Sequence, residues 1–536
     1  MTGLVAGMSW GRGLATRVGV VGAMGLAAIG AASCVTPSST DAELEENPLG
    51  RTLALNAPGP PARVLMISVA GLVASDFLAA DGYVAVEGDR VRMPRLAQLA
   101  REGVVGDRAM PPSPGSKYAS HASLVTGRLP ARHGVLADVR FDAEGRLEIP
   151  FWDSRMLEAE TLWDAAIGRS VLALGWPTTV GARIELVLPE ARSSDPSRPW
   201  LDLMRGMSSP FVIHELEVIA AEALGDQEGF LASEREPATW PTPAEKDAAL
   251  MEVACHVALS ERDPGLWLIR LDQTEAAQRS AGTGSVELAA ALRRIDQEIG
   301  YLFDCLEEVG QLADTAIFVV GDVAYRPVHT RVDPNIALVA KGLIGRDPRS
   351  ASGVRSWLAI ARTHGRSAYV YAKDAANALA AREILETEAA RTGAFRVVSA
   401  AELAQAGVDP QAWFGLEAAP GFEIGDGLLR PVLRPTETRA SAGALSLPGE
   451  PAGAVGFVAW GRGIRSQVRV PRLELVDLAP TIAMLLGLRL DDDIDGTALS
   501  GILRAAVPPP PPGPKRLGVG SKGDAERTLR EMGGGR

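Results

Sequence analysis

The 536-residue sequence has few of the residues that bind metals or anions: six histidines, six lysines and three cysteines. Lys+Arg number 54 against 66 Asp+Glu, which gives a formal net charge of -12, and no segment gathers its positive residues into a basic face. Neutralising the phosphates of a nucleic acid requires clustered Lys and Arg, so we expect no nucleic-acid partner. Three cysteines in a chain of this length exclude a disulfide-rich scaffold.

The chain also lacks an internal repeat and a hydrophobic run long enough for a comfortable transmembrane helix. Its composition is that of a globular protein, with 46% hydrophobic and 22% charged residues. This composition supplies one large core or two smaller ones, and it excludes a chain that is disordered throughout or collagen-like.

The N-terminus has the pattern of an export signal. Arg12 and Arg17 precede a run of apolar and small residues over 18–32, and no acidic residue occurs before Asp41. A positively charged segment followed by a short apolar segment is typical of a secretory signal peptide. We therefore expect residues 1–33 to be a signal peptide and the protein to be exported.

A cysteine follows this signal. The small residues before Cys34 resemble the bacterial lipobox, in which the cysteine is lipidated, although Ala31 stands where leucine is usual. An ordinary signal peptide that ends near Cys34 by chance is the alternative. Since Val35 rather than aspartate follows Cys34, we expect a lipoprotein of the bacterial cell envelope, held in the outer membrane through Cys34 and facing the periplasm.

Polar segments flank the globular part of the chain. Residues 34–62 are rich in Pro, Ser, Thr and Glu and are expected to form a flexible tether. Residues 504–536 contain an unbroken proline run and a Gly-rich charged end, a composition that predicts disorder.

The two remaining cysteines, Cys255 and Cys305, lie 50 residues apart, each within a helical apolar pattern. Their connectivity cannot be deduced from spacing, so pairing stays open. Two buried free thiols are the expectation.

Strand and helix patterns alternate between 63 and 503. The short apolar runs that predict buried strands are 63–69, 170–174, 266–271, 316–320 and 453–461. The apolar spacings that predict helices are at 94–102, 285–309 and 475–488, the last interrupted near Pro480. We therefore expect an α/β fold with a doubly wound, mostly parallel central sheet and helices on both faces.

One segment of the chain resembles a known family. The segment at 116–135 reads SKYASHASLVTGRLPARHGV and is preceded by RVLMISVAGL at 63–72. Together they resemble the type I phosphodiesterase/nucleotide pyrophosphatase family of the alkaline phosphatase superfamily. The sulfatases share much of this arrangement of motifs. Further landmarks follow in the same order: LWLIRLD at 266–272, VVGD at 319–322 and FVAWGRGI at 457–464. The resemblance implies an alkaline-phosphatase-like fold.

The resemblance spans 63–503 as an ordered set of landmarks. Two segments, 184–262 and 363–439, have no counterpart among these landmarks and are interpreted as insertions that form a cap around the site. Loops in such places decide what enters a site, so the substrate class is not predicted.

The resemblance also implies a metal-dependent ester hydrolase. Family members neutralise the ester with two zinc ions held by Asp and His, and attack it with a Thr or Ser at a helix N-terminus. Here the nucleophile position is Lys117, and the position of a phosphate-binding Asn is Asp138. Ser116 is adjacent but would need a shift of register. An ammonium group is no hydroxyl nucleophile and a carboxylate repels phosphate, so a phosphate substrate is disfavoured.

The implied metal ligands are incomplete. Asp272 and Asp322 keep two ligand positions, and the segment expected to hold the last histidine, 441–447, contains none. Other ligand positions carry residues that cannot bind zinc: Ala70, Ala276 and Val323. We therefore expect no zinc cofactor. The alternative is a single zinc or loosely bound divalent ion held by the two aspartates and His329.

Two further expectations concern side chains around this site. His121 and His133 are interpreted as packing or hydrogen-bonded residues. If Asp272 and Asp322 converge without metal, they repel each other, so we expect the Lys117 ammonium group within hydrogen-bonding distance of one or both. A solvent-exposed Lys117, and aspartates that only cap strand ends, are the alternatives.

Two functions from different classes follow. The first, which we expect, is a catalytically degenerate family member that acts as a binding or scaffold protein for an unidentified protein or small-molecule ligand. The second is an active phosphodiesterase, phosphatase or sulfatase-like hydrolase with a rearranged metal site.

Overall fold

The structure is a computed structural model, which describes residues 59–78, 92–140, 149–190, 199–223, 241–349, 353–445 and 453–504. The expected signal peptide, Cys34, nearly all of the expected tether and the tail from 505 onward lie outside these residues. Within the described ranges, no helix is long and apolar enough to cross a membrane.

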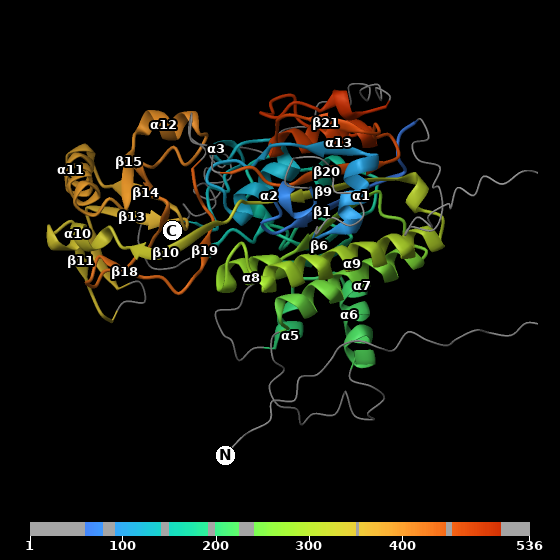
Figure 1. Ribbon diagram of the computed structural model, residues 1–536, viewed down its shortest axis with the longest axis horizontal. Coiled ribbons are helices and arrows are strands. Elements are labelled where there is room, and N and C mark those ends of the chain that lie inside the picture. The colour runs from blue at the N-terminus through green and yellow to red at the C-terminus, as the bar shows by residue number, and fades with distance from the viewer. Residues whose placement is uncertain are drawn as a thin grey trace, which may run out of the picture.

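An eight-stranded sheet forms the centre of the larger lobe (Figure 1). In spatial order its strands are β21 (Val468–Val470), β2 (Val104–Gly106), β20 (Phe457–Gly461), β9 (Thr315–Gly321), β1 (Arg63–Val69), β8 (Leu266–Leu271), β6 (Val171–Trp176) and β7 (Leu186–Pro189). The strands from β9 to β7 run parallel, whereas β20 is antiparallel to both neighbours. The predicted mostly parallel sheet is confirmed.

Helices cover both faces of this sheet. One face packs against α1 (Pro94–Glu102), α5 (Trp200–Arg205), α6 (Pro210–Ala223), α7 (Pro243–Leu259) and α9 (Val286–Glu308). The other packs against α2 (Lys117–Thr126), α4 (Leu162–Ala165) and α13 (Leu478–Leu486). Alternate residues of β1 enter the two cores, Leu65 and Ile67 one and Val64 and Met66 the other, which explains its uninterrupted apolar sequence.

The longest helix follows its predicted pattern. α9 begins after Ser285, whose Oγ accepts a hydrogen bond of 3.1 Å from the Leu288 N–H. Its apolar stripe is buried against the sheet. The segment predicted at 475–488 as an interrupted helix forms a 3-10 helix, Leu475–Asp477, followed by α13, whose first turn contains Pro480. Proline fits there because the first turn needs no N–H donor from that residue.

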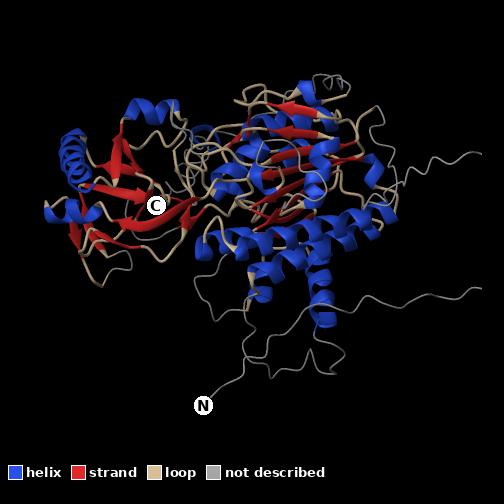
Figure 2. Cartoon of the chain, viewed as in Figure 1, coloured by secondary structure: helices blue, strands red, loops and turns tan. Residues whose placement is uncertain are grey.

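A smaller lobe lies beside the sheet and contains residues 326–445 (Figure 2). Its helices are α10 (Asn335–Ala340), α11 (Ala375–Thr392) and α12 (Ala400–Gln405). Its strands are β10 (Arg326–Val332), β11 (Ile344–Arg346), β12 (Val354–Trp357), β13 (Ala359–Thr363), β14 (Ser367–Ala372), β15 (Phe395–Val398), β16 (Phe414–Ala418), β17 (Gly421–Ile424), β18 (Leu433–Pro435) and β19 (Ala440–Ser441). The lobe has its own apolar core and contains the whole of the predicted insertion 363–439.

Short elements join the main ones. They are α3 (Pro130–His133), α8 (Gln273–Ala281), and the strand pairs β3 (Ala109–Met110) with β22 (Leu473–Glu474) and β4 (Val139–Arg140) with β5 (Ile149–Pro150). The described part of 184–262 supplies β7, α5, α6 and α7. Apolar side chains of this described part join the core of the large lobe, so it covers one face of the sheet. Glu190 and Lys246 of the same segment pair with Lys117 and Asp272, so the segment also reaches the predicted site.

Cys255 in α7 and Cys305 in α9 form a disulfide with a Cα–Cα distance of 5.6 Å. The expectation of two free thiols is therefore wrong. Each cysteine lies on the face by which its helix packs into the core, and these two faces meet. The sequence pattern placed each cysteine on a helix face but contained no information on which helices are neighbours.

Candidate functional site

The predicted site residues gather at one edge of the sheet. Asp272 follows β8 and Asp322 follows β9, and both strands pair with β1, which ends just before Ala70. The carboxyl ends of adjacent parallel strands form the usual ligand-binding edge of an α/β sheet. The α2 helix reaches the same edge, because His121 Nε2 lies 2.9 Å from the hydroxyl of Ser68 in β1.

A buried arginine lies among the carboxylates of this edge. Arg270 in β8 is 1% exposed, and its Nη1 lies 3.0 Å from Asp272 Oδ2. Its Nη2 lies 3.0 Å from Glu275 Oε2 and 3.8 Å from Asp322 Oδ2. Burial alone would lower the pKa of Arg270, but the charges of these carboxylates outweigh it and raise that pKa well above its ordinary value. The guanidinium group is therefore charged.

Asp272 has a second cationic partner. The ammonium group of Lys246, in the first turns of α7, pairs with Asp272 Oδ2. Burial opposes ionisation of Asp272, but Lys246 and Arg270 together lower its pKa to about 2. Asp272 is therefore ionised at neutral pH.

Asp322 is held mainly by backbone groups. Its Oδ1 accepts hydrogen bonds from the N–H groups of Gly71, at 2.9 Å, and Val323, at 2.7 Å. Gly71 has a φ of 70°, and a Cβ at this position would lie 2.2 Å from Gln278 Nε2, so the turn requires glycine. Burial raises the pKa of Asp322 in spite of the nearby Arg270.

Lys117, at the start of α2, is buried, but its partner is not the expected one. Its Nζ lies 2.6 Å from Oε1 of Glu190, which follows β7, and the hydroxyl of Tyr118 donates to the same carboxylate. The expected hydrogen bond to Asp272 or Asp322 is replaced by this pair. The reason is that Arg270 and Lys246 already neutralise the aspartates, whereas Glu190 brings a further carboxylate to α2. Lys117 still acts on Asp272 through space, because its charge helps to lower the Asp272 pKa.

The N-terminus of α2 accepts an anion from the chain itself. Asp138 Oδ1 lies 3.1 Å from the backbone N–H of Tyr118 in the first turn of that helix. Helix N-termini stabilise negative charge, so this position suits a carboxylate. Asp138 therefore caps the helix at the place where the resemblance puts a residue that binds substrate phosphate.

Residues 77–406 match the family described as type I phosphodiesterase / nucleotide pyrophosphatase. The matched segment is more than half of the chain and contains Lys117, Asp138, Asp272 and Asp322. The chain belongs to this family. A search among curated proteins found no match.

The zinc ions of the type I phosphodiesterase family do not fit the residues present here. Zinc sites need several His, Cys or carboxylate ligands around one ion. Three of the expected ligand positions are aliphatic: Ala70, Ala276 and Val323. In the described part of the chain, no group of three or more His, Cys, Asp or Glu side chains is arranged to hold a metal ion. The carboxylates that remain, Asp272 and Asp322, face Arg270 and Lys246 instead.

The segment expected to hold the last histidine does reach the site. Its described part, 441–445, lies next to the residues that precede α2, because the Gly115 N–H donates to Ala444 O at 3.1 Å. His329, the alternative ligand, is an exposed residue of β10, where its Nδ1 lies 2.8 Å from Thr330 Oγ1 and its ring contacts Phe422.

The histidines of the nucleophile segment have the structural roles that were expected. His121 is buried, with Nδ1 2.7 Å from Lys117 O and its ring edge-on to Trp176. His133 Nδ1 accepts a hydrogen bond from the Val135 N–H at 3.1 Å, and its Nε2 lies 3.0 Å from Ser123 Oγ. Burial lowers the pKa of His133 to about 3, so its imidazole is neutral.

A second layer of carboxyl groups supports α8, which begins directly after Asp272. Asp247 Oδ2 accepts hydrogen bonds from the N–H groups of Asp272, at 2.9 Å, and Gln273, at 2.8 Å. Burial and the charge of Asp272 raise the pKa of Asp247 to about 7. Glu298 accepts from Gln273 Nε2 at 3.1 Å, and burial with the charge of Asp247 raises its pKa to about 8. These groups position the strand end that carries Asp272.

Four charged residues of the site were not singled out from the sequence: Glu190, Lys246, Arg270 and Glu275. Arg270 had a usable signal, because an arginine inside the apolar run LWLIRLD needs buried carboxylates as partners. Glu190 directly follows a buried strand in the same way. Lys246 lies on a polar turn of a helix, where nothing in the pattern distinguishes it from a solvent-exposed lysine.

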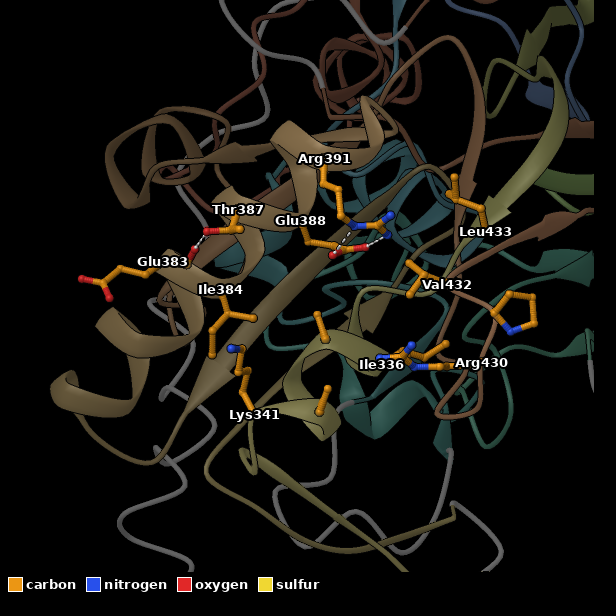
Figure 3. Close-up of a pocket in the computed structure, with 13 residues that line it drawn as sticks. Ile336, Lys341, Glu383, Ile384, Thr387, Glu388, Arg391, Arg430, Val432 and Leu433 are labelled. Atoms are coloured by element: carbon orange, nitrogen blue, oxygen red, sulfur yellow. Dashed lines mark hydrogen bonds and ion pairs between the residues drawn. The ribbon is translucent and has the colours of Figure 1, made fainter.

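The smaller lobe has a separate hollow of about 900 Å3 between α10, α11 and the segment 430–433 (Figure 3). Apolar side chains line part of it: Ile336, Ala337, Ala340, Ile384, Val432 and Leu433. Its charged lining residues are Lys341, Glu383, Glu388, Arg391 and Arg430. Glu388 and Arg391 form an ion pair. Lys341 and Arg430 have no side-chain partner within the described ranges.

Proposed function

We propose that this member of the type I phosphodiesterase family is catalytically degenerate and acts as a binding or scaffold protein. The observation that carries the proposal is that three cations of the chain are paired with carboxylates at the positions where the family's chemistry takes place. Lys117 pairs with Glu190, and Arg270 and Lys246 pair with Asp272. Substrate and metal would both have to break these pairs.

The nucleophile position supports the same conclusion. A lysine is no hydroxyl nucleophile, and the Lys117 Nζ is held in a buried pair 2.6 Å from Glu190 Oε1. Ser116, the neighbouring hydroxyl, is buried and has no hydrogen-bond partner among the described residues. Both ring nitrogens of the nearby His121 are already engaged, by Lys117 O and Ser68. Within the described ranges, His121 is therefore not available as a base to activate the Ser116 hydroxyl.

Restoring the hydroxyl tests this proposal. We expect Lys117→Thr to leave an aryl phosphodiester unhydrolysed, because a hydroxyl without a metal keeps a high pKa. Hydrolysis should require the full set of substitutions: Lys117→Thr, Ala70→Asp, Ala276→His, Val323→His and a histidine within 441–447. The matched control is Lys117→Met, which offers no nucleophile. Hydrolysis of the phosphodiester by Lys117→Thr alone with metal added, but not by this control, would refute the proposal.

We propose the hollow of the smaller lobe as the ligand site, and an anionic, partly apolar small molecule as its ligand. The apolar lining suits a hydrocarbon portion, and the cations of Lys341 and Arg430 suit a carboxylate or similar head group. Outside the Glu388–Arg391 pair, the two cations Lys341 and Arg430 outnumber the one carboxylate, Glu383, so the hollow favours an anion although the chain as a whole is acidic.

Decanoate serves as the probe for this site in isothermal titration calorimetry. The variant Lys341→Glu/Arg430→Glu should lose binding through charge repulsion. Arg382→Glu is the matched control, because Arg382 lies on α11 outside the hollow and pairs with Glu386. Equal binding by all three proteins, or none by the unmodified protein, would refute the ligand class.

We also propose that the protein is an exported lipoprotein anchored through Cys34. The Cys255–Cys305 disulfide supports export, because structural disulfides persist in oxidising compartments outside the cytosol. Cys34→Ala should move the protein from the membrane fraction to the soluble fraction. Ser33→Ala keeps a small residue before the cysteine and should stay membrane-bound. Retention of Cys34→Ala in the membrane fraction would refute the anchor.

A further inference from the structure

Arg270 contacts each of the carboxylates that the larger lobe gathers at the ends of β8 and β9. Its two terminal nitrogens reach Asp272 and Glu275 at 3.0 Å and Asp322 at 3.8 Å. We propose that the Arg270 guanidinium is the built-in cation of this site and takes the electrostatic role that metal ions have elsewhere in the family. The inference rests on the proposed function, because both require a site without bound zinc.

The other cations of the site do not fill this role. Lys246 reaches Asp272 only, from the start of α7, and Lys117 is paired with Glu190. Arg270 is the residue that links Asp272 to Asp322, the two surviving ligand positions. A planar guanidinium with several fixed donors suits this task better than an ammonium group, because it can face carboxylates in different directions at once.

Two carboxylate oxygens at this site lack a hydrogen bond among the described residues. They are Oδ1 of Asp272 and Oδ2 of Asp322, and Asp322 is 1% exposed. Buried oxygens of this kind are ordinarily satisfied by a donor or a cation. The groups that Arg270 contacts are all carboxylates, so its removal would leave only oxygen donors beside the space it fills: those of Asp272, Glu275 and Asp322.

Such a donor set selects a class of cation. Oxygen ligands favour Mn2+, Ca2+ or Mg2+ over zinc, which prefers nitrogen and sulfur. Arg270→Ala removes the positive charge and leaves space between the carboxylates. The inference therefore predicts that this variant gains a divalent-cation site that the unmodified protein does not have.

The test titrates Mn2+ into the full-length protein and into Arg270→Ala, and follows binding by calorimetry and the melting temperature. The variant should melt at a lower temperature without metal, recover with Mn2+, and bind Mn2+ more than about tenfold more tightly than the unmodified protein. The double variant Arg270→Ala/Asp322→Asn should lose the gain. Arg270→Lys keeps the positive charge and should show no gain in Mn2+ binding.

Arg63→Ala is the matched control. Arg63 is also a buried strand arginine, pairs with Asp263, and lies at the opposite end of β1 from the site. Its loss should lower the melting temperature without any response to Mn2+. If Arg270→Ala does not fold without metal, the melting temperature cannot be used. The measurement is then the soluble yield of the variant expressed with Mn2+ compared with its yield in the presence of a chelator. Equal yields would overturn the inference.

Two results would overturn the inference directly: a folded Arg270→Ala that ignores Mn2+, or an unmodified protein that is stabilised by Mn2+ as strongly as the variant. Neither result depends on turnover. Hydrolysis by a metal-free unmodified protein would refute the proposed function and leave the role of Arg270 standing, so the two failures are distinguishable.

Discussion

Lys117 and Glu190 are 6% and 7% exposed, and their charged atoms lie 2.6 Å apart. Removing one partner of a buried ion pair leaves an uncompensated charge and costs on the order of 3–5 kcal/mol. We expect Lys117→Met to lower the free energy of unfolding by that amount in urea titrations. The double variant Lys117→Met/Glu190→Gln should recover much of the loss. An unchanged melting temperature in the single variant would contradict the buried pair.

His133 makes the stability depend on pH with a definite sign. Burial lowers its pKa from 6.5 to about 3, so between these values the unfolded chain binds a proton that the folded chain does not. Stability contributed by the neutral imidazole is complete above pH 6.5 and falls as the pH falls, by up to about 1.4 kcal/mol per pH unit.

The comparison with His133→Asn isolates this effect. Asparagine can still accept the hydrogen bond from Val135 but does not titrate. The variant should be less stable at pH 7, yet lose less stability per pH unit between pH 6.5 and pH 4 than the unmodified protein. Parallel pH profiles of the free energy of unfolding would contradict a buried neutral His133.

Single residues of the site were predictable where a motif fixed their position. Asp272, Asp322 and Lys117 do come to one edge of the sheet, because each follows or begins an element whose place the resemblance defines. The sequence could have indicated that Arg270 needs buried carboxylates, but not which cation pairs with which carboxylate. Lys117 pairs with Glu190 and not with Asp272 because other cations already neutralise Asp272. Which carboxylate is left for Lys117 is decided only when the whole site is assembled.

At the scale of elements, local pattern was sufficient for most of the larger lobe. β1, β8 and α1 have the predicted bounds, and α9 begins directly after Ser285, the first residue of its predicted range. The strand predicted at 453–461 begins only at Phe457. Element boundaries of this kind depend on tertiary pairing, and pairing between distant helices, as in the disulfide, leaves no mark in local periodicity.

The disulfide makes its own prediction. It joins α7, which carries Lys246 and Asp247, to α9, which carries Glu298. Replacing both cysteines by serine should lower the free energy of unfolding by about 2–4 kcal/mol, the usual effect of removing such a crosslink. Reductant should destabilise the unmodified protein similarly and leave the double variant unchanged. Two free thiols in the native, non-reduced protein would contradict the pairing.

At the scale of the whole molecule, the two lobes have separate apolar cores and separate candidate sites. The larger lobe keeps the sheet and the carboxyl edge of the family but fills that edge with its own ion pairs. The smaller lobe has a separate core and a hollow of about 900 Å3. This division was not predictable, because a composition of small apolar and charged residues at 326–445 does not say whether the segment covers a site or stands beside it.

The central claim is that the family's chemistry has been replaced by internal ion pairing, and metal content measured together with turnover tests it most directly. The full-length purified protein is analysed for zinc and assayed on an aryl phosphate and an aryl phosphodiester, before and after chelation and zinc addition. We predict no stoichiometric zinc and no hydrolysis under any of these conditions. Stoichiometric zinc with hydrolysis that disappears on chelation and returns with zinc would contradict the account.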